Sequence, residues 1–339
     1  MGSFLFSWRG VLRISRKALR ESDSVNILCQ NQHIFSIYLL FLGNYFMKRI
    51  FLFLVTNLAV MLVIGIIFNV LGLHSSLAAN GVNLDLTKLL IMSAIIGSSG
   101  SIISLLMSKW SAKSAMGVHV IEQPQNQTEQ WLVNIVARQA QHAGIGMPEV
   151  GIFQSDDLNA FATGANKDNA LVAVSTGLLR QMSQDEIEAV VGHEISHVAN
   201  GDMITMALMQ GVVNTFVYFF ATVIGHVVDK VILKNEERGY GIAYYITQMA
   251  AQIILGILAS MLTMWFSRYR EFRADAGGAN LAGREKMINA LRALQRAHEP
   301  EALPGQLAAF GINSGGSMMK LFMTHPPLEE RIAALQHLR

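Results

Sequence analysis

Four uncharged stretches of the chain are each long enough to cross a lipid bilayer as a helix. They occupy residues 50–71, 89–108, 203–228 and 239–267. About 20 apolar residues in helical conformation span the hydrocarbon core of a membrane. The 339-residue chain is 52% hydrophobic and only 15% charged, which is too apolar for an ordinary soluble protein of this length. The sequence therefore predicts an α-helical membrane part with four spans.

The last two stretches carry more polar side chains than the first two, namely Gln210, Asn214, His226 and Gln248. Two buried helices of a soluble domain are the alternative interpretation of these stretches. Polar residues inside a membrane span usually face neighbouring helices rather than lipid. We therefore expect these side chains to pack between the spans.

Lysine and arginine residues flank the predicted spans unevenly. They follow the second and fourth spans and precede the first: Lys48, Arg49, Lys109, Lys113, Arg268, Arg270 and Arg273. The loop between the first two spans carries only Asp85 and Lys88. Because cytoplasmic flanks are enriched in lysine and arginine, we expect both termini and the segments 109–202 and 268–339 to face the cytoplasm. The net charge of +2 gives no indication of a nucleic-acid partner.

Two histidines lie four positions apart in the stretch GHEISHVANGD, at His193 and His197. On a helix they share one face, so both imidazoles can reach one metal ion. A catalytic zinc keeps three protein ligands and an open position for water, and Glu194 lies beside that position, where it can accept a proton. The pattern is the H-E-x-x-H signature of metalloproteases, although five letters can also match by chance. The single cysteine excludes a cysteine zinc cage.

The residues around this motif favour a helix. Ser183 followed three residues later by Glu186 forms a capping box that precedes a periodic apolar run. Asn200 and Gly201 then supply a stop signal. We expect one helix from Ser183 through His197.

Zinc bound by two histidines and a water lacks one protein ligand. The chain returns from its last two spans at SRYREFRAD, where Glu271 and Asp275 lie four apart on a helix that we expect to continue through residue 294. One carboxylate can bind zinc while the other hydrogen-bonds a ligating imidazole. Glutamate has the longer reach. The alternative is a solvated acidic pair balanced by neighbouring arginines.

Residues 149–180 have the pattern of short strands with a turn at residues 167–169, which suggests a hairpin. A strand edge beside the zinc helix can hold an extended peptide by main-chain hydrogen bonds. The segment 159–164 is the candidate, with Asn159, Ala160 and Phe161 as substrate-binding residues. An ordinary sheet strand is an equally good interpretation of the residues alone.

The segment THPPLEERI places His325 before two prolines and a final helix. The simple interpretation is an extended turn imposed by the prolines. An imidazole near the zinc can also stabilise the oxyanion of the tetrahedral intermediate. Arg331, one helical turn further on, either pairs with Asp275 or another carboxylate of the site or, more simply, is a surface charge.

From Met47 onward the chain resembles the HtpX family of bacterial inner-membrane zinc metalloproteases, which are relatives of the CAAX prenyl endopeptidases. The matching segments include MKRIFLFLVTNLAVMLV, NAFATG, GHEISHVANGDM, SRYREFRADAG and HPPLEERI. The resemblance implies that Glu271 is the third zinc ligand, that Glu194 is the catalytic base and that His325 stabilises the oxyanion. It also implies degradation of damaged or misfolded membrane proteins during envelope stress, with other quality-control membrane proteases as partners. Residues 1–46 have no counterpart in the family pattern, and we expect Met47 to be the natural start.

These observations predict a multi-pass inner-membrane zinc metalloendopeptidase with a cytoplasmic α+β, zincin-like catalytic domain. The expected segments are an N-terminal extension, two transmembrane hairpins and two catalytic parts, at residues 1–46, 47–108, 203–267, 109–202 and 268–339. One zinc ion per chain is held by His193, His197 and Glu271, Asp275 supports a ligand, and Glu194 takes the proton from the zinc-activated water. The alternatives are a non-proteolytic chaperone or scaffold that zinc stabilises, and a prenyl-protein processing peptidase.

Overall fold

The computed structural model describes residues 84–235, 239–298 and 325–338, together with isolated positions between 51 and 79. The predicted N-terminal extension, residues 1–46, lies outside the described residues, as does most of the predicted first span, residues 50–71. Residues 59–339 form one compact unit, to which the following description applies.

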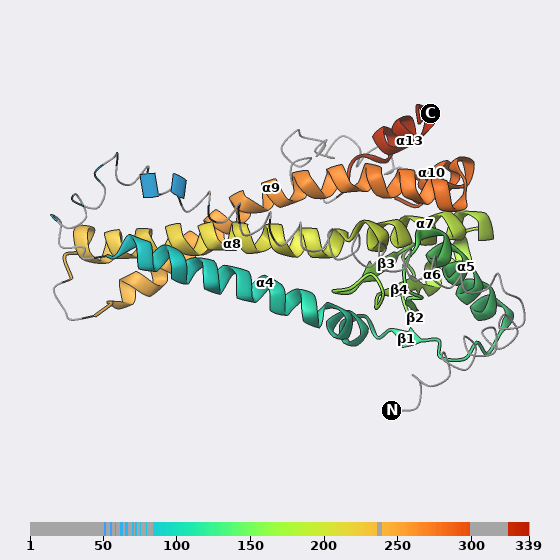
Figure 1. Ribbon diagram of the computed structural model, residues 1–339, viewed down its shortest axis with the longest axis horizontal. Helices are drawn as coiled ribbons and strands as arrows, with labels where there is room; N and C mark the ends of the chain where they lie inside the picture. Colours follow the sequence, from blue (N-terminus) through green and yellow to red (C-terminus); the bar gives the residue numbers. More distant parts are fainter. Residues whose placement is uncertain are drawn as a thin grey trace, which may run out of the picture. The chain divides into compact units, whose positions relative to one another are not determined.

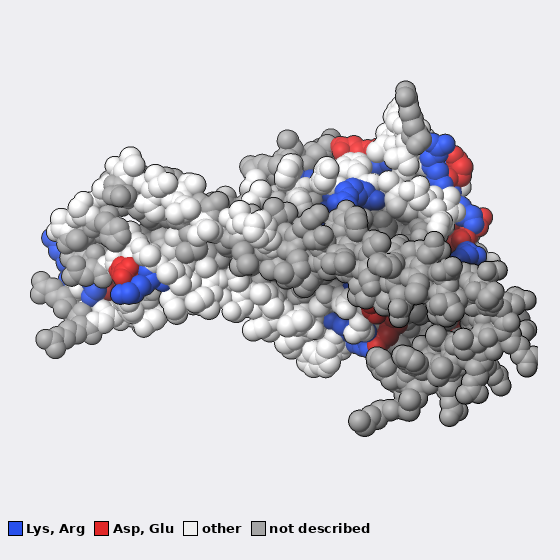
Figure 2. Space-filling model, viewed as in Figure 1, with Lys and Arg blue, Asp and Glu red and all other residues white. Residues whose placement is uncertain are grey.

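Three helices in the described part of the chain are long and apolar enough to cross a membrane (Figure 1). They are α4 (Leu86–Met116), α8 (Asp202–His226) with its π-helical extension η1 (Val227–Ile232), and α9 (Ile242–Ala282). They coincide with three of the four predicted spans. Helix α8 packs against both α4 and α9, and it is the most buried of the three. On the face drawn in Figure 2, the described charged side chains gather near the two ends of these helices and leave an uncharged surface between them.

Helix α9 includes both the predicted last span and the EFRAD segment. The span and the segment that carries Glu271 form one continuous helix of 41 residues. The predicted continuation through residue 294 is wrong, because α9 ends at Gly283 and a new helix, α10 (Arg284–His298), follows. Gly283 has a φ of 107°, which glycine adopts without steric cost and which ends the helical path.

A four-stranded sheet lies beside these helices, in the order β1-β2-β4-β3. The strands are β1 (His119–Val120), β2 (Glu149–Phe153), β3 (Ala160–Thr163) and β4 (Leu171–Ser175). Strands β2 and β4 are parallel, and β3 and β4 form the predicted antiparallel hairpin around residues 167–169. Strand β3 is an edge strand, so one side of its backbone is not paired within the sheet.

The apolar core of the catalytic part lies between this sheet and the helices around it. Helix α5 (Gln127–Ala143) buries Leu132, Ile135 and Val136, as the helical spacing of its apolar residues predicts. Helix α7 (Gln184–Asn200) adds Ile187, Val191 and Ile195, and α10 adds its own apolar face. The short helix α6 (Thr176–Gln181) follows β4, and α13 (Leu328–Gln336) packs against α9 and α10.

Candidate metal centre

Helix α7 carries the two histidines of HEISH, and its ends follow the predicted local signals. Ser183 and Glu186 form the capping box reciprocally, so the first backbone N–H groups are satisfied. Gly201 ends the helix with a φ of 62°. His193 and His197 therefore project from the last two turns of a helix that is fixed at both ends, and both are buried.

Glycines allow α9 to approach the backbone of α7 closely enough to complete the site. A Cβ atom built on Gly278 would lie 3.0 Å from the backbone nitrogen of His193, and one built on Gly277 would lie 1.9 Å from Ser196 Oγ. Any side chain at these positions would push the two helices apart. The sequence Ala276-Gly277-Gly278 thus determines how near the carboxylates of α9 come to the histidines of α7.

Ligand atoms of three side chains converge between the two helices. The Nε2 atoms of His193 and His197 are 3.1 Å apart. Glu271 places Oε1 at 3.3 Å from His197 Nε2 and Oε2 at 3.5 Å from His193 Nε2. All three side chains are buried, and they form the metal-binding group identified among the described residues.

These distances suit a tetrahedral zinc ion. Zinc binds imidazole nitrogen and carboxylate oxygen at about 2.0–2.1 Å, so two ligands of one tetrahedron are separated by about 3.3–3.4 Å. The two Nε2 atoms are 3.1 Å apart, and each lies 3.3 or 3.5 Å from a different oxygen of the Glu271 carboxylate, so the separations are close to that value. Three protein ligands leave the fourth position for water, which is the arrangement of a catalytic rather than a structural zinc site.

Carboxylates hold the other ring nitrogen of each histidine. His193 Nδ1 lies 2.9 Å from Asp275 Oδ1, and His197 Nδ1 lies 2.7 Å from Asp202 Oδ2. A carboxylate at Nδ1 fixes the ring orientation and leaves the Nε2 lone pair for the metal. Burial lowers the pKa of His197, but its contacts with Asp202 and Glu271 outweigh burial and raise the pKa to about 9. The carboxylates around this imidazole therefore stabilise a positive charge at this position, and the charge of a bound metal ion would be stabilised in the same way.

Asp202 did not enter the predicted site. It is buried in the first turn of α8, directly after the glycine that ends α7. The chain reverses at Gly201 and brings the carboxylate back to His197, five residues upstream. The sequence signal for this contact is the acidic residue directly after the predicted end of the helix.

Arg331 occupies the inside of the site, so its interpretation as a surface charge is wrong. Its Nε and Nη2 atoms donate to Asp275 Oδ2 and Oδ1 at 2.8 and 2.6 Å, and Nη1 lies 3.5 Å from Glu271 Oε2. Burial lowers the pKa of Arg331, but the carboxylate of Asp275 more than compensates and raises it. Helix α13 thus packs against α9 and holds the carboxylate that contacts His193.

His325, just before α13, also reaches the site. Its Nδ1 atom lies 2.7 Å from Glu271 Oε2, and 59% of its side chain is exposed to solvent. The histidine of the HPP segment is therefore in contact with the third ligand while its outer face remains accessible. The structure brings it together with the other site residues over a long separation in sequence.

Glu194 is partly buried beside the two histidines and is not among the three ligands. Burial raises the pKa of its carboxyl group, and the neighbouring His193 and His197 lower it in part. Helix α7, which carries Glu194, packs against the edge strand β3. A carboxylate with a raised pKa next to a metal position is suited to accept a proton and release it again.

Successive residues of β3 direct their backbone N–H and C=O groups alternately toward β4 and toward the unpaired edge of the sheet. Asn159 O accepts a hydrogen bond from Ser175 N at 2.8 Å, so Asn159 and Phe161 direct their backbone groups toward β4. Ala160 and Ala162 direct theirs toward the open edge, on the side of α7. The predicted substrate residues Asn159, Ala160 and Phe161 therefore lie at the start of an edge strand that contacts the zinc helix.

Three comparisons with known proteins, by family model, by sequence and by structure, each give matches. The sequence model described as Peptidase family M48 matches residues 126–339. Protease HtpX from Thioalkalivibrio sulfidiphilus is 63% identical over 292 residues, covering 86% of this chain and 99% of the relative. A Protease HtpX homolog from Nitrosomonas eutropha is 60% identical over 291 residues, with coverage of 86% and 99%. Among solved structures, S. mikatae Ste24p has a TM-score of 0.54 at 18% identity, covering 82% of this chain and 67% of that chain, which is a likeness of fold.

Proposed function

The chain belongs to peptidase family M48, among the HtpX proteases, and from this premise we propose which proteins it cleaves and which residues perform the cleavage. Members of this group are membrane zinc metalloproteases, so the substrates of this chain are proteins. We assign to it the hydrolysis of peptide bonds in misfolded or damaged membrane proteins, as part of envelope stress quality control in the bacterial inner membrane. One zinc ion per chain is held by His193, His197 and Glu271.

The observation that carries this assignment is the continuity of α9. The predicted fourth span ends at residue 267, and Glu271 follows on the same helix four residues later. At 1.5 Å per residue, this distance is about 6 Å along the helix axis. A site so close to the end of a membrane span is accessible to segments that leave the bilayer, which supports membrane proteins as substrates.

The residue roles follow from their contacts. A bound zinc ion polarises the scissile carbonyl and lowers the pKa of water. Glu194, with its raised pKa, accepts the proton of the attacking water and delivers it to the leaving amine. His325, whose Nδ1 contacts Glu271 and whose side chain is largely exposed, donates its other ring N–H to the oxyanion. Asp275, held by Arg331, keeps His193 oriented, and the open edge of β3 holds the substrate as an added strand.

The two alternatives have less support. A zinc ion that only joins helices favours a closed shell of four protein ligands and needs no adjacent base, whereas this site has three ligands and Glu194. The likeness to Ste24p at 18% identity concerns the fold, so prenyl-protein processing is not proposed.

Purified full-length protein in detergent tests the proposed activity directly. After removal of metal by a chelator, the protein should be inactive, and added zinc should restore digestion of unfolded casein. The expected readout is the appearance of casein fragments only in the zinc-treated sample. An increase in thermal stability with zinc, without cleavage of any peptide bond, would contradict the proposal and favour the scaffold alternative.

We propose further that the catalytic part faces the cytoplasm, since Lys109 and Lys113 lie near the C-terminal end of α4 and arginine residues follow the predicted last span. The connection between η1 and α9 should then lie on the opposite side. In a Cys29→Ser chain, Lys234→Cys should react with a membrane-impermeant maleimide in spheroplasts. Glu122→Cys, on the catalytic part, is the matched control and should react only after permeabilisation. The reverse labelling pattern would refute the proposed orientation.

A further inference from the structure

We propose that a cavity between α4 and α8 binds the part of a membrane substrate that has unwound from its transmembrane helix and leads into the edge of β3. The cavity has a volume of about 390 Å³. Its walls come from α4, α8 and the last residue of β3. This inference rests on the proposed function. It specifies, in addition, where a membrane substrate would leave the bilayer.

Polar side chains form part of the cavity wall, alongside apolar ones such as Leu105 and Met206, although the cavity lies between predicted membrane spans. Hydroxyl and amide side chains line it: Ser101, Ser104, Ser108, Thr163, Gln210 and Asn214. Gln210 donates to Asn214 across one helical turn at 2.8 Å. Ser108 Oγ is buried and has no hydrogen-bond partner among the described residues. The opposite face of α4 is apolar and exposed, with Ile103 at 55% and Leu106 at 67%, as expected of a surface in contact with lipid.

The cavity is bounded by fixed contacts at both ends. At its inner end the backbones of α4 and α8 touch, because a Cβ atom on Gly97 would lie only 2.6 Å from the backbone nitrogen of Thr215. From there α4 diverges from α8 toward the sheet (Figure 1). At the sheet, Lys109 of α4 binds Glu149 at 2.9 Å and Asn169 at 2.6 Å. The separation of the two helices is thus built into the fold.

An unwound segment inside the membrane needs the groups that this cavity supplies. Once a helix is opened, its backbone N–H and C=O groups lose their partners, and lipid offers none. A serine hydroxyl both donates and accepts hydrogen bonds, and a side-chain amide does the same. The cavity therefore suits a polypeptide backbone in extended form better than it suits an intact apolar helix.

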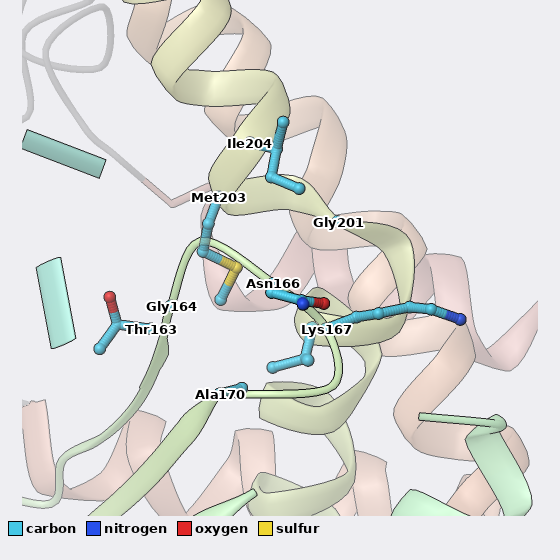
Figure 3. Close-up of a pocket in the computed structure, with 9 residues that line it drawn as sticks. Thr163, Gly164, Asn166, Lys167, Ala170, Gly201, Met203 and Ile204 are labelled. Atoms are coloured by element: carbon cyan, nitrogen blue, oxygen red, sulfur yellow. The ribbon is translucent and has the colours of Figure 1, made fainter. Parts of the chain in front are cut away.

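The cavity and the metal site lie at the same edge strand. Thr163 lines the cavity and is the last residue of β3, and β3 packs against α7, which carries Glu194. Figure 3 shows Thr163 at this strand end and Met203, from the first turn of α8, beside the connection that follows it; Met203 lines the same cavity. Adjacent residues of a strand are about 3.3 Å apart. A substrate strand paired with β3 would therefore be cut a few residues beyond the end of its membrane segment.

Disulfide trapping tests the location of the substrate. The full-length protein carries Cys29→Ser, which removes the native cysteine, and Glu194→Gln, so that bound substrate is not cut. A single new cysteine is then placed either in the cavity, by Ser104→Cys, or on the opposite, exposed face of α4, by Ile103→Cys. The probe is a single-span membrane protein with one cysteine two residues inside the cytoplasmic end of its span. We expect at least ten-fold more trapped complex with Ser104→Cys. Equal yields, or a higher yield with Ile103→Cys, would overturn the inference.

A variant that fills the cavity provides an independent measurement with Glu194 intact. Ala207→Phe places a ring in the cavity from α8, and Leu106→Phe places the same ring on the exposed face of α4. The ratio of membrane-substrate cleavage to casein cleavage should fall at least ten-fold in Ala207→Phe and stay at the wild-type value in Leu106→Phe. An unchanged ratio in Ala207→Phe overturns the cavity while leaving the protease assignment in place. Failure of the wild-type protein to cut casein would instead reject the proposed function.

Discussion

The Glu194→Gln variant is expected to bind zinc as the wild-type chain does and to cleave casein about 1,000-fold more slowly. Glu194 is outside the three-ligand group, so an uncharged side chain of the same shape leaves the metal contacts intact. The amide can no longer accept the proton of the attacking water. General acid–base catalysis contributes about 10²–10⁴-fold to an enzymatic rate. Zinc content by mass spectrometry and the initial rate of casein cleavage, measured on one preparation, test both parts of this expectation.

Glu188→Gln is the matched control for this experiment. Glu188 lies on the same helix but pairs with Lys286 and Arg138 away from the metal, so it should keep both zinc and activity near wild-type levels. If Glu194→Gln cleaves at the wild-type rate, Glu194 is not the base. If it loses zinc, its effect cannot be assigned to proton transfer.

The parts of the site that the sequence predicts are those whose signals are local. The HEISH helix is marked by its capping box and by the glycine after it, and both features are present at Ser183 and Gly201. The same applies to Glu271 and Asp275, because a separation of four residues on a helix places two side chains on one face. The choice of Glu271 as ligand came from the family resemblance, and its distances to the histidines agree with it.

The parts that sequence reasoning missed or left open depend on contacts between distant segments. The pairing of Arg331 with Asp275 requires α13 to pack against α9, and no local pattern fixes that packing. The close approach of α7 and α9 depends on Gly277 and Gly278, which resemble an ordinary interruption in a helix until the neighbouring helix is known. Apolar length identified the spans but could not show that α9 continues through the ligand segment without a break.

A second large effect is expected when the third ligand loses its charge. Glu271→Gln keeps the size of the side chain but replaces a carboxylate with a weakly coordinating amide, so zinc affinity should fall more than about 100-fold, and casein cleavage should disappear at limiting zinc. Loss of a group that only supports a ligand typically weakens metal binding about 10–100-fold. Asp202→Asn is therefore the matched comparison, since it removes one charge from the contact with His197 and leaves all three ligands in place.

Zinc titration against a competing chelator, together with the increase in melting temperature on adding zinc, separates these two variants without relying on activity. A ligand that binds only the folded state raises stability in proportion to the logarithm of its concentration over Kd, so weaker binding shifts the zinc-dependent increase to higher zinc concentrations. The shift should be larger for Glu271→Gln than for Asp202→Asn. If Glu271→Gln binds zinc as tightly as the wild-type chain, the carboxylate is not a ligand. The 3.3 and 3.5 Å contacts with the histidines would then be hydrogen bonds of a metal-free cluster.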